Sequence, residues 1–107
     1  MNFELGPPEM LDLGEGYKFP QIRPRVHCED GFSMSVQASE NHYCLPNDNE
    51  GPYLEAEVGY PSEAEPLLME YSEDPENPAK TVYGHVPLEV INEIIDRHGG
   101  LASERVD

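Results

Sequence analysis

Residues 81–100, TVYGHVPLEVINEIIDRHGG, give the clearest indication of how this chain folds. The first six are dense in residues that favour β-strands. The residues from Pro87 to His98 carry an apolar stripe with the 3.6-residue period of an α-helix. Pro87 suits the first helical position, and the Gly-Gly pair that follows His98 suits a left-handed cap. The stretch therefore predicts a strand, then a helix whose apolar side lies on a sheet.

Two more strands are predicted upstream, over residues 25–28 and 32–39, joined by the turn Glu29-Asp30-Gly31. Every second residue from Phe32 to Ala38 is apolar, and the residues between them are polar. This period of two is typical of a strand with one buried face and one solvated face.

Residues 53–60 alternate in the same way and predict another strand. The face expected to be buried holds Leu54, Ala56, Val58 and Tyr60. The face expected to be exposed holds Tyr53, Glu55, Glu57 and Gly59. Residues 67–71 predict a short edge strand, and the segments 40–52 and 72–80 are rich in turn formers.

Together these elements predict an α+β fold, in which a mostly antiparallel sheet of about four strands is packed by one C-terminal helix. Residues 22–107 are expected to form a single small domain. Residues 1–21, rich in Gly and Pro, are expected to be an extended and partly flexible arm. Met10, Leu11 and Leu13 of this arm are candidates to dock on the body or on a second copy.

The composition predicts a small hydrophobic core and bears on where in the cell the chain is found. Of its 107 residues 37% are hydrophobic, below the roughly 45–50% of a typical globular domain. No run approaches the roughly 20 apolar residues of a membrane span. The first thirteen residues carry three carboxylates and no basic residue, which does not match a signal peptide. We therefore expect the chain in the cytoplasm, or in a host cell's cytoplasm.

The charge distribution is the strongest functional signal. Between Arg25 and Lys80 there are thirteen carboxylates and no Lys or Arg, which accounts for most of the formal net charge of −16. These carboxylates must be solvated, bind cations or face a basic partner. The same acidity argues against direct binding of nucleic acid and of anionic membranes.

The acidic tract yields a predicted partner-binding site. On a strand, alternate residues lie about 6.8 Å apart, so Glu55 and Glu57 are expected to project together. Regularly spaced carboxylates on a rigid scaffold resemble a phosphate backbone and fit a Lys/Arg-rich groove. The other interpretation is an acidic surface that serves only solubility. The predicted site residues are Tyr53, Glu55, Glu57, Glu63, Glu65, Glu70, Glu73, Asp74 and Glu76.

Metal and cofactor sites are not expected. The pairs His27-Cys28 and His42-Tyr43-Cys44 supply soft ligands, but their spacing fits no common zinc motif. The run 47–51, NDNEG, lacks the spacing of a calcium loop.

An enzyme is not expected either. A Cys–His pair would have to be in contact to act as nucleophile and base, and no catalytic signature surrounds either cysteine. Free thiols are the favoured state of Cys28 and Cys44, and a single bridge between adjacent strands is the alternative.

Four segments carry a resemblance to a known group: 30–39 (DGFSMSVQAS), 42–44 (HYC), 82–87 (VYGHVP) and 98–100 (HGG). Across residues 26–100 the chain resembles small acidic proteins encoded by phages and prophages. The resemblance implies an anti-defence class that includes anti-CRISPR inhibitors and DNA mimics. It implies no reaction and no role for a particular residue.

The sequence leads to two functional hypotheses. The first is a non-enzymatic inhibitor that mimics nucleic acid and binds a basic host protein or ribonucleoprotein complex of a defence system. The second is a phage structural or assembly accessory protein that oligomerises, for example as a homodimer. Its contacts would be the N-terminal arm or the 67–71 edge.

Overall fold

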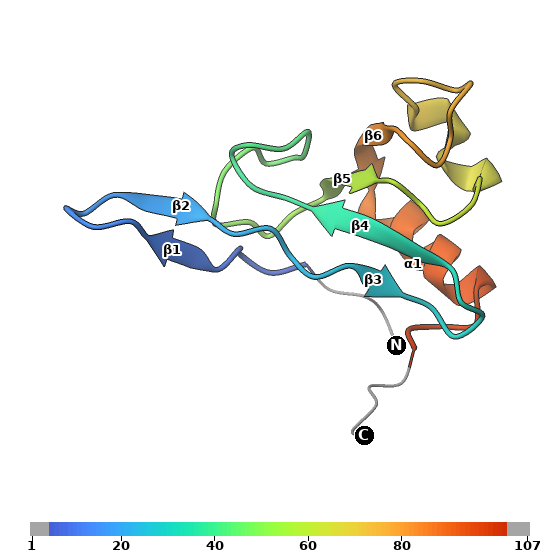
Figure 1. The fold of residues 1–107 in the computed structure, drawn as a ribbon, viewed down its shortest axis with the longest axis horizontal. Coiled ribbons are helices and arrows are strands. Elements are labelled where there is room, and N and C mark those ends of the chain that lie inside the picture. The colour runs from blue at the N-terminus through green and yellow to red at the C-terminus, as the bar shows by residue number, and fades with distance from the viewer. Residues whose placement is uncertain (1–4, 103–107) are drawn as a thin grey trace.

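The computed structural model describes residues 5–102, so the outer ends of the predicted arm and domain lie outside the described residues. In chain order the elements are β1 (Met10–Asp12), β2 (Lys18–Pro20), β3 (Val26–His27), β4 (Ser33–Gln37), β5 (Glu55–Gly59), the 3₁₀-helix η1 (Pro66–Tyr71), β6 (Val82–Pro87) and α1 (Leu88–Arg97). Figure 1 shows their arrangement.

The body is an antiparallel sheet in the order β3-β4-β5-β6 with α1 packed against it. Both the α+β fold and the strand–helix unit at 81–100 are therefore confirmed. None of the described helices is long and apolar enough to cross a membrane.

The core lies between the sheet and the helix. Each alternate apolar residue from Phe32 to Ala38 is at most 2% exposed, and so are Ile91, Ile94 and Ile95 of α1. After α1 the chain turns at Gly99, whose φ is +88° and where an added Cβ would lie 3.2 Å from the Cβ of Glu29. Glycine avoids both the strain and the contact, as the predicted cap requires.

The second face of β4 is not solvated, contrary to prediction. Ser33, Gln37 and Ser39 are buried. The segment that leads into β3 covers this face: the backbone N–H of Arg23 donates to Oε1 of Gln37 (2.8 Å), and Nε2 of Gln37 donates to the carbonyl of Arg23 (3.0 Å). Arg25 Nε donates to Ser33 Oγ (2.9 Å). Polar side chains can be buried here because a segment distant in the sequence supplies their hydrogen-bond partners.

The alternation predicted over 53–60 holds only from Glu55 to Val58, because Gly59, expected to be exposed, is buried at the end of β5. Tyr53 is 3% exposed and Leu54 is 66% exposed, which reverses the predicted faces. Both residues precede β5, which begins at Glu55, and the N–H of Leu54 donates to the carbonyl of Leu45 (2.7 Å) instead of to a sheet partner. Tyr60, expected to be buried, is 53% exposed and has φ of +47°, so it turns the chain out of the sheet.

The edge strand predicted at 67–71 is also wrong, because these residues form η1. Pro66 occupies the start of the helix, and the Glu65 side chain accepts a hydrogen bond from the N–H of Leu67 (2.9 Å). A capped start with proline favours a helical turn over an extended strand.

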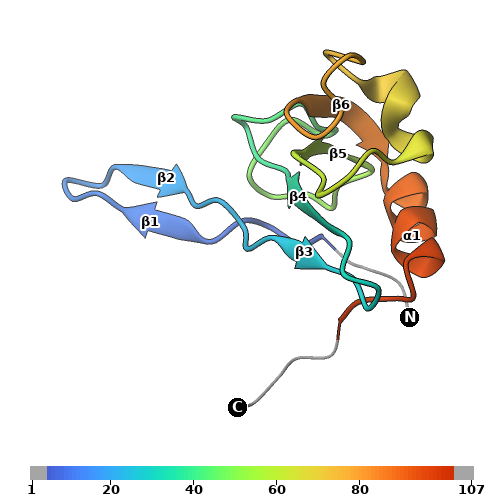
Figure 2. The same cartoon turned by 45° about the vertical axis from the view of Figure 1, so that its right-hand side comes forward.

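The N-terminal arm contains a hairpin, β1–β2, with Leu11 opposite Phe19 and Asp12 opposite Lys18. Figures 1 and 2 both show this hairpin projecting from the body, with its tip far from the four-stranded sheet. The turn residues Gly14, Glu15 and Gly16 all have positive φ.

Candidate functional site

The structure divides the nine predicted site residues into three groups. Those exposed to solvent are Glu63, Glu70, Glu73 and Glu76. Those half-buried are Glu55, Glu57 and Asp74. Those buried are Tyr53 and Glu65. Seven of the nine therefore remain available to a partner, from β5 and from the segment that runs through η1 into the following loop.

Tyr53 has a structural role in this arrangement. Its hydroxyl donates to the carbonyl of Asp48 (2.6 Å), and the guanidinium of Arg23 lies 5.7 Å from its ring centre. Burial raises the pKa of the Tyr53 phenol. The side chain holds the loop 40–52 against the body and is only 3% exposed in this structure.

Glu65 belongs to a partly buried clamp that the sequence analysis missed. Its Oε1 lies 2.8 Å from Nε2 of His98, while Nδ1 of His98 lies 2.6 Å from Oδ2 of Asp30. The His98 ring also stacks on Phe32, with centres 4.1 Å apart. Thus one imidazole ties the end of α1 to the start of η1 and to the β3–β4 turn.

Burial by itself lowers the pKa of His98, but its hydrogen bonds to the Glu65 and Asp30 carboxylates outweigh burial and raise the pKa above its ordinary value. The N–H of Phe32 and the His98 ring in turn lower the pKa of Asp30. A protonated imidazole between two carboxylates is the state that satisfies all three groups.

Glu55 and Glu57 project together from β5, as predicted. Glu55 Oε1 lies 3.0 Å from Nδ1 of His85, and Glu57 Oε1 accepts a hydrogen bond from the N–H of Tyr43 (3.2 Å). The register shift between β5 and β6, where His85 has φ of +52°, positions that imidazole beside Glu55. Both carboxylates are therefore partly engaged within the chain.

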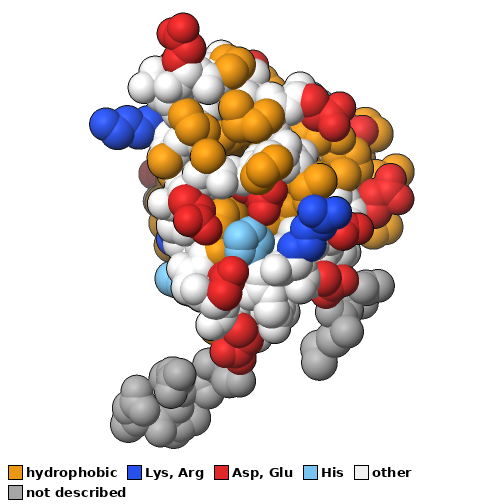
Figure 3. Space-filling view, turned by 90° about the vertical axis from the view of Figure 1, so that its right-hand side faces the viewer, with side chains coloured by type: hydrophobic (Ala, Val, Ile, Leu, Met, Phe, Trp, Pro, Cys, Tyr) orange, Lys and Arg blue, Asp and Glu red, His pale blue; other side chains and the backbone are white. Residues whose placement is uncertain are grey.

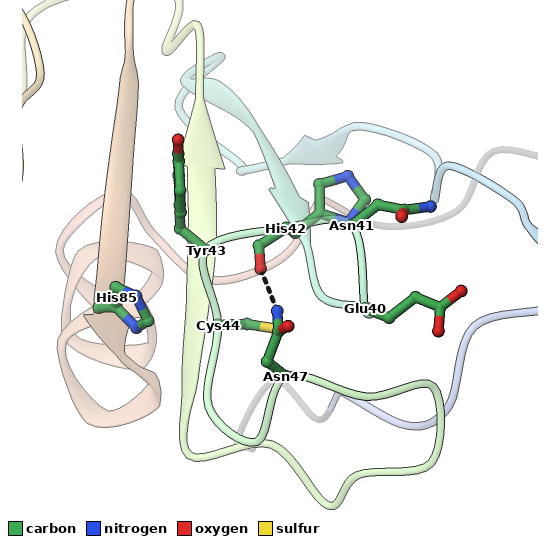
Figure 4. Close-up of a pocket in the computed structure, with 7 residues that line it drawn as sticks. All are labelled: Glu40, Asn41, His42, Tyr43, Cys44, Asn47 and His85. Carbon is green, nitrogen blue, oxygen red and sulfur yellow. Dashed lines mark hydrogen bonds between the residues drawn. The ribbon is translucent and has the colours of Figure 1, made fainter.

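A pocket of about 430 Å³ lies next to this pair and is drawn in Figure 4. Its lining includes His42, Cys44, Asn47 and His85. Cys44 is buried, and its thiol donates to the carbonyls of Ser39 (3.2 Å) and Pro46 (3.3 Å). His42 Nδ1 lies 2.7 Å from Ser39 Oγ, and burial lowers the pKa of His42. The two groups weighed as nucleophile and base thus have other hydrogen-bond partners.

The cysteines form no disulfide, and the side chains weighed as metal ligands are not gathered as a metal site in the described residues. Cys28 and Cys44 are free and buried. Across residues 5–102, no three His, Cys, Asp or Glu side chains are placed to hold one metal ion.

Three carboxylates carry charge close enough to affect the Tyr71 phenol. Burial raises the pKa of the Tyr71 phenol, and the charges of Glu70, Glu89 and Glu55 raise it further. These three acids come from η1, α1 and β5, so three elements direct negative charge at one point of the surface. Glu89 is a member that the sequence analysis did not include.

Two grooves lie beside this cluster and share Glu89. One, of about 390 Å³, lies between η1 and α1, and the other, of about 430 Å³, lies beside the start of β5. Together their linings include Leu45, Leu54, Glu55, Leu67, Pro87, Leu88, Glu89, Val90, Glu93 and Arg97, which we call the acidic–apolar face. Figure 3 shows the side that carries η1 and α1, where hydrophobic side chains gather and acidic side chains surround them.

The basic side chains do little to neutralise these acids. Arg97 pairs with Glu93 (2.9 Å) on the exposed side of α1. Arg23 donates to the carbonyls of Ala38 and Gly6, and Arg25 donates to Ser33 and to the carbonyl of Tyr60. Two of the six Lys and Arg residues are therefore directed at uncharged acceptors.

Comparison with protein-family models, with curated proteins and with solved structures found no match. The resemblance to phage proteins stays a prediction.

Proposed function

We propose that this chain is a non-enzymatic acidic binding protein that occupies the Lys/Arg-rich nucleic-acid groove of a basic partner. In the form suggested by the sequence, it is a phage-encoded inhibitor, acting in the host cytoplasm on a defence protein or ribonucleoprotein complex. It competes with nucleic acid and does not bind nucleic acid itself.

One observation carries this proposal: within residues 5–102, the exposed carboxylates of the segment through η1 form no ion pair with a Lys or Arg side chain. Glu63, Glu70, Glu73 and Glu76 are exposed on the segment through η1, while Arg23 and Arg25 are turned toward backbone and hydroxyl oxygens elsewhere. Folding therefore leaves a strong negative field on this side of the molecule, which attracts a cationic groove and increases its association rate.

The acidic–apolar face adds a second requirement for the partner. Leu54 is 66% exposed and Leu45 is 47% exposed beside Glu55. Apolar area gives affinity that charge alone does not give, since exposed ion pairs contribute about 0–1 kcal/mol each. The partner surface is expected to combine Lys and Arg with apolar side chains.

The test is capture of partners from a bacterial lysate by the immobilised protein at low salt, with a salt gradient for elution. We expect a nucleic-acid-binding protein to be captured, to elute as salt rises and to be displaced by added DNA or RNA. Reversal of the four exposed charges (Glu63→Lys, Glu70→Lys, Glu73→Lys and Glu76→Lys) should abolish capture with an unchanged circular dichroism spectrum.

A matched variant changes the net charge equally at exposed sites elsewhere: Glu9→Lys, Glu15→Lys, Glu40→Lys and Glu50→Lys. This variant should still capture the partner if the carboxylates of the segment through η1, and not the net charge of the whole chain, attract it. Equal loss in both variants, or capture that does not change with salt, would contradict the proposal. A third variant, Leu54→Ser, should weaken capture without altering its salt dependence.

One observation favours the assembly protein as a second candidate. The β1–β2 hairpin carries exposed apolar side chains, among them Tyr17 at 65% and Phe19 at 48% exposure. Isolated apolar patches of this kind mark protein–protein contacts. Stable oligomers of the pure protein, together with no capture from lysate, would favour this function over inhibition.

A further inference from the structure

The two carboxylates that contact His98 differ in their access to water. Nδ1 of His98 lies 2.6 Å from Oδ2 of Asp30, and Nε2 lies 2.8 Å from Oε1 of Glu65. We call these contacts the Asp30 arm and the Glu65 arm of the clamp. The side chain of Asp30 is 47% exposed, whereas that of Glu65 is 7% exposed. Each carboxylate also accepts one backbone N–H, from Phe32 and from Leu67 respectively. The two arms are therefore not equivalent.

Only the protonated ring can donate to both carboxylates. An imidazolium donates from both nitrogens, whereas a neutral imidazole has one N–H and one lone pair. After the proton is lost, one carboxylate faces that lone pair and needs another donor. Water can reach the half-exposed side chain of Asp30 but hardly reaches that of Glu65, and a buried carboxylate without a donor is costly. The neutral ring should therefore keep its proton on Nε2, where it donates to Glu65.

We propose that the clamp is a pH-sensitive latch in which the Asp30 arm opens when His98 loses its proton, while the Glu65 arm stays closed. The start of η1 is then held to the end of α1 in both protonation states. The β3–β4 turn is held by the imidazole only in the protonated state. The latch does not depend on the function proposed above.

The segment that follows α1 lies against this turn and along the edge of the sheet. The N–H of Glu29 donates to the carbonyl of Gly100 (2.9 Å). The N–H of Asp30 donates to the carbonyl of His98 (3.1 Å). The N–H of Ala102 donates to a carbonyl of β3 (2.8 Å), which is the outer strand of the four-stranded sheet. Opening of the Asp30 arm removes one of the ties between the turn and this segment, so it loosens the cover of a sheet edge.

The charges around the ring set the direction of the switch. Burial lowers the pKa of His98, but the hydrogen bonds to Glu65 and Asp30 outweigh burial and raise it. A contribution from a raised pKa is present at low pH and is lost as pH rises through the folded value, so the latch opens on the alkaline side. The titratable groups on the elements that contact or adjoin the ring are Cys28, Glu29, Asp30, Glu65, Asp96 and Arg97. The only cation among them, Arg97, pairs with Glu93.

Imidazole nitrogen NMR spectra of the full chain across the titration of His98 test the proposal. The pH range is chosen to extend well to either side of about 6.5, the ordinary pKa of histidine. The chain has four histidines, and His98→Phe identifies the signals of His98. We expect both ring nitrogens to carry a proton at the acid end and Nε2 alone at the alkaline end. A neutral ring with its proton on Nδ1 overturns the proposal, as does a ring that does not titrate.

Hydrogen exchange of single amides separates opening of one arm from a general loss of stability. The amide of Asp30 is bound to the carbonyl of His98, and that of Leu67 is bound to Glu65. As His98 loses its proton, the protection factor of the Asp30 amide should fall about tenfold, as expected for loss of a charge-assisted hydrogen bond. That of Leu67 should stay within about twofold. Equal loss of protection at both amides would overturn the proposal.

A matched pair of variants identifies the arm that opens. Asp30→Ser removes the carboxylate that is released and keeps an oxygen for the N–H of Phe32. We expect His98 to titrate at lower pH in this variant, with the neutral proton still on Nε2, and the protection of the Glu29 amide to become independent of pH. Glu63→Ser removes an exposed carboxylate and should leave the latch unchanged. If the loss of protection with rising pH persists in Asp30→Ser, Asp30 is not the arm that opens.

Discussion

His98 is the residue whose environment departs furthest from what its sequence context suggests. It follows the last turn of α1, where a histidine usually stays in water, yet both of its ring nitrogens contact carboxylates and its ring covers Phe32. The protonated form donates to Asp30 and Glu65 together, whereas the neutral form donates to only one of them. The clamp therefore depends on the charge of one imidazole.

The first prediction concerns pH. Because the folded pKa of His98 is raised, its contribution to stability is fully present below the unfolded pKa of about 6.5 and is lost as pH rises through the folded pKa. His98→Phe keeps an aromatic ring on Phe32 but removes both donors. We expect it to lower the free energy of unfolding by about 2 kcal/mol near pH 6, and by less as pH rises.

Urea unfolding of the parent chain and of His98→Phe between pH 6 and pH 9 measures the difference in their free energies of unfolding. His42 has a lowered pKa and acts with the opposite sign as pH falls, but it is present in both proteins and cancels. Asp30 also has a lowered pKa, so its effect appears only in the acid range. A difference that is constant from pH 6 to pH 9 would contradict a contribution from the charge of His98.

At the scale of elements, η1 depends on one buried carboxylate. Glu65 accepts the N–H of Leu67 at the start of η1 and also contacts His98, while its side chain is only 7% exposed. Glu63, two residues earlier, is exposed. Two glutamates of one short segment therefore differ in role, although both were expected to contact a partner.

The second prediction compares these two glutamates. Glu65→Ala removes the cap of η1 and the partner of His98, so we expect a loss of roughly 2–3 kcal/mol in the free energy of unfolding. Glu63→Ala should change it by less than about 0.5 kcal/mol. Chemical denaturation at pH 6 measures both, and equal effects of the two substitutions would contradict the capping role.

The described part of the molecule consists of a small acidic body and a two-stranded hairpin that extends from it. The body carries most of the carboxylates, and the hairpin exposes several apolar side chains. Mutual repulsion of carboxylates within the body opposes compaction, so the folded state carries an electrostatic cost that depends on salt.

The third prediction follows from this cost. Raising NaCl from about 0.02 M to about 0.5 M should increase the free energy of unfolding by on the order of 1 kcal/mol, because screening weakens the repulsion. Reversing Glu9, Glu15, Glu40 and Glu50 to Lys changes the formal net charge from −16 to −8 and should reduce the effect. Urea midpoints measure both, and a midpoint that is insensitive to salt in the parent chain would contradict this account.

The elements whose signal is local could be predicted from the order of the residues. The α1 helix, the turn at Gly31 and the buried side of β4 were predicted correctly, because periodicity and capping residues act over a few neighbours. The antiparallel α+β class followed from these elements. The exposed carboxylates of η1 and its loop were also predictable, since solvated charge is the default state of a carboxylate.

Which residues lose contact with water could be seen only in the folded chain. Tyr53 is buried because it reaches Asp48 and Arg23, and Glu65 is buried because it meets His98, thirty-three positions away. The polar side of β4 is covered because Arg23 returns to it from outside the sheet. Burial of these residues depends on partners that are distant in the sequence, which a local sequence pattern cannot indicate. The physical reason that the structure differs from the prediction at each of these residues is therefore a long-range contact.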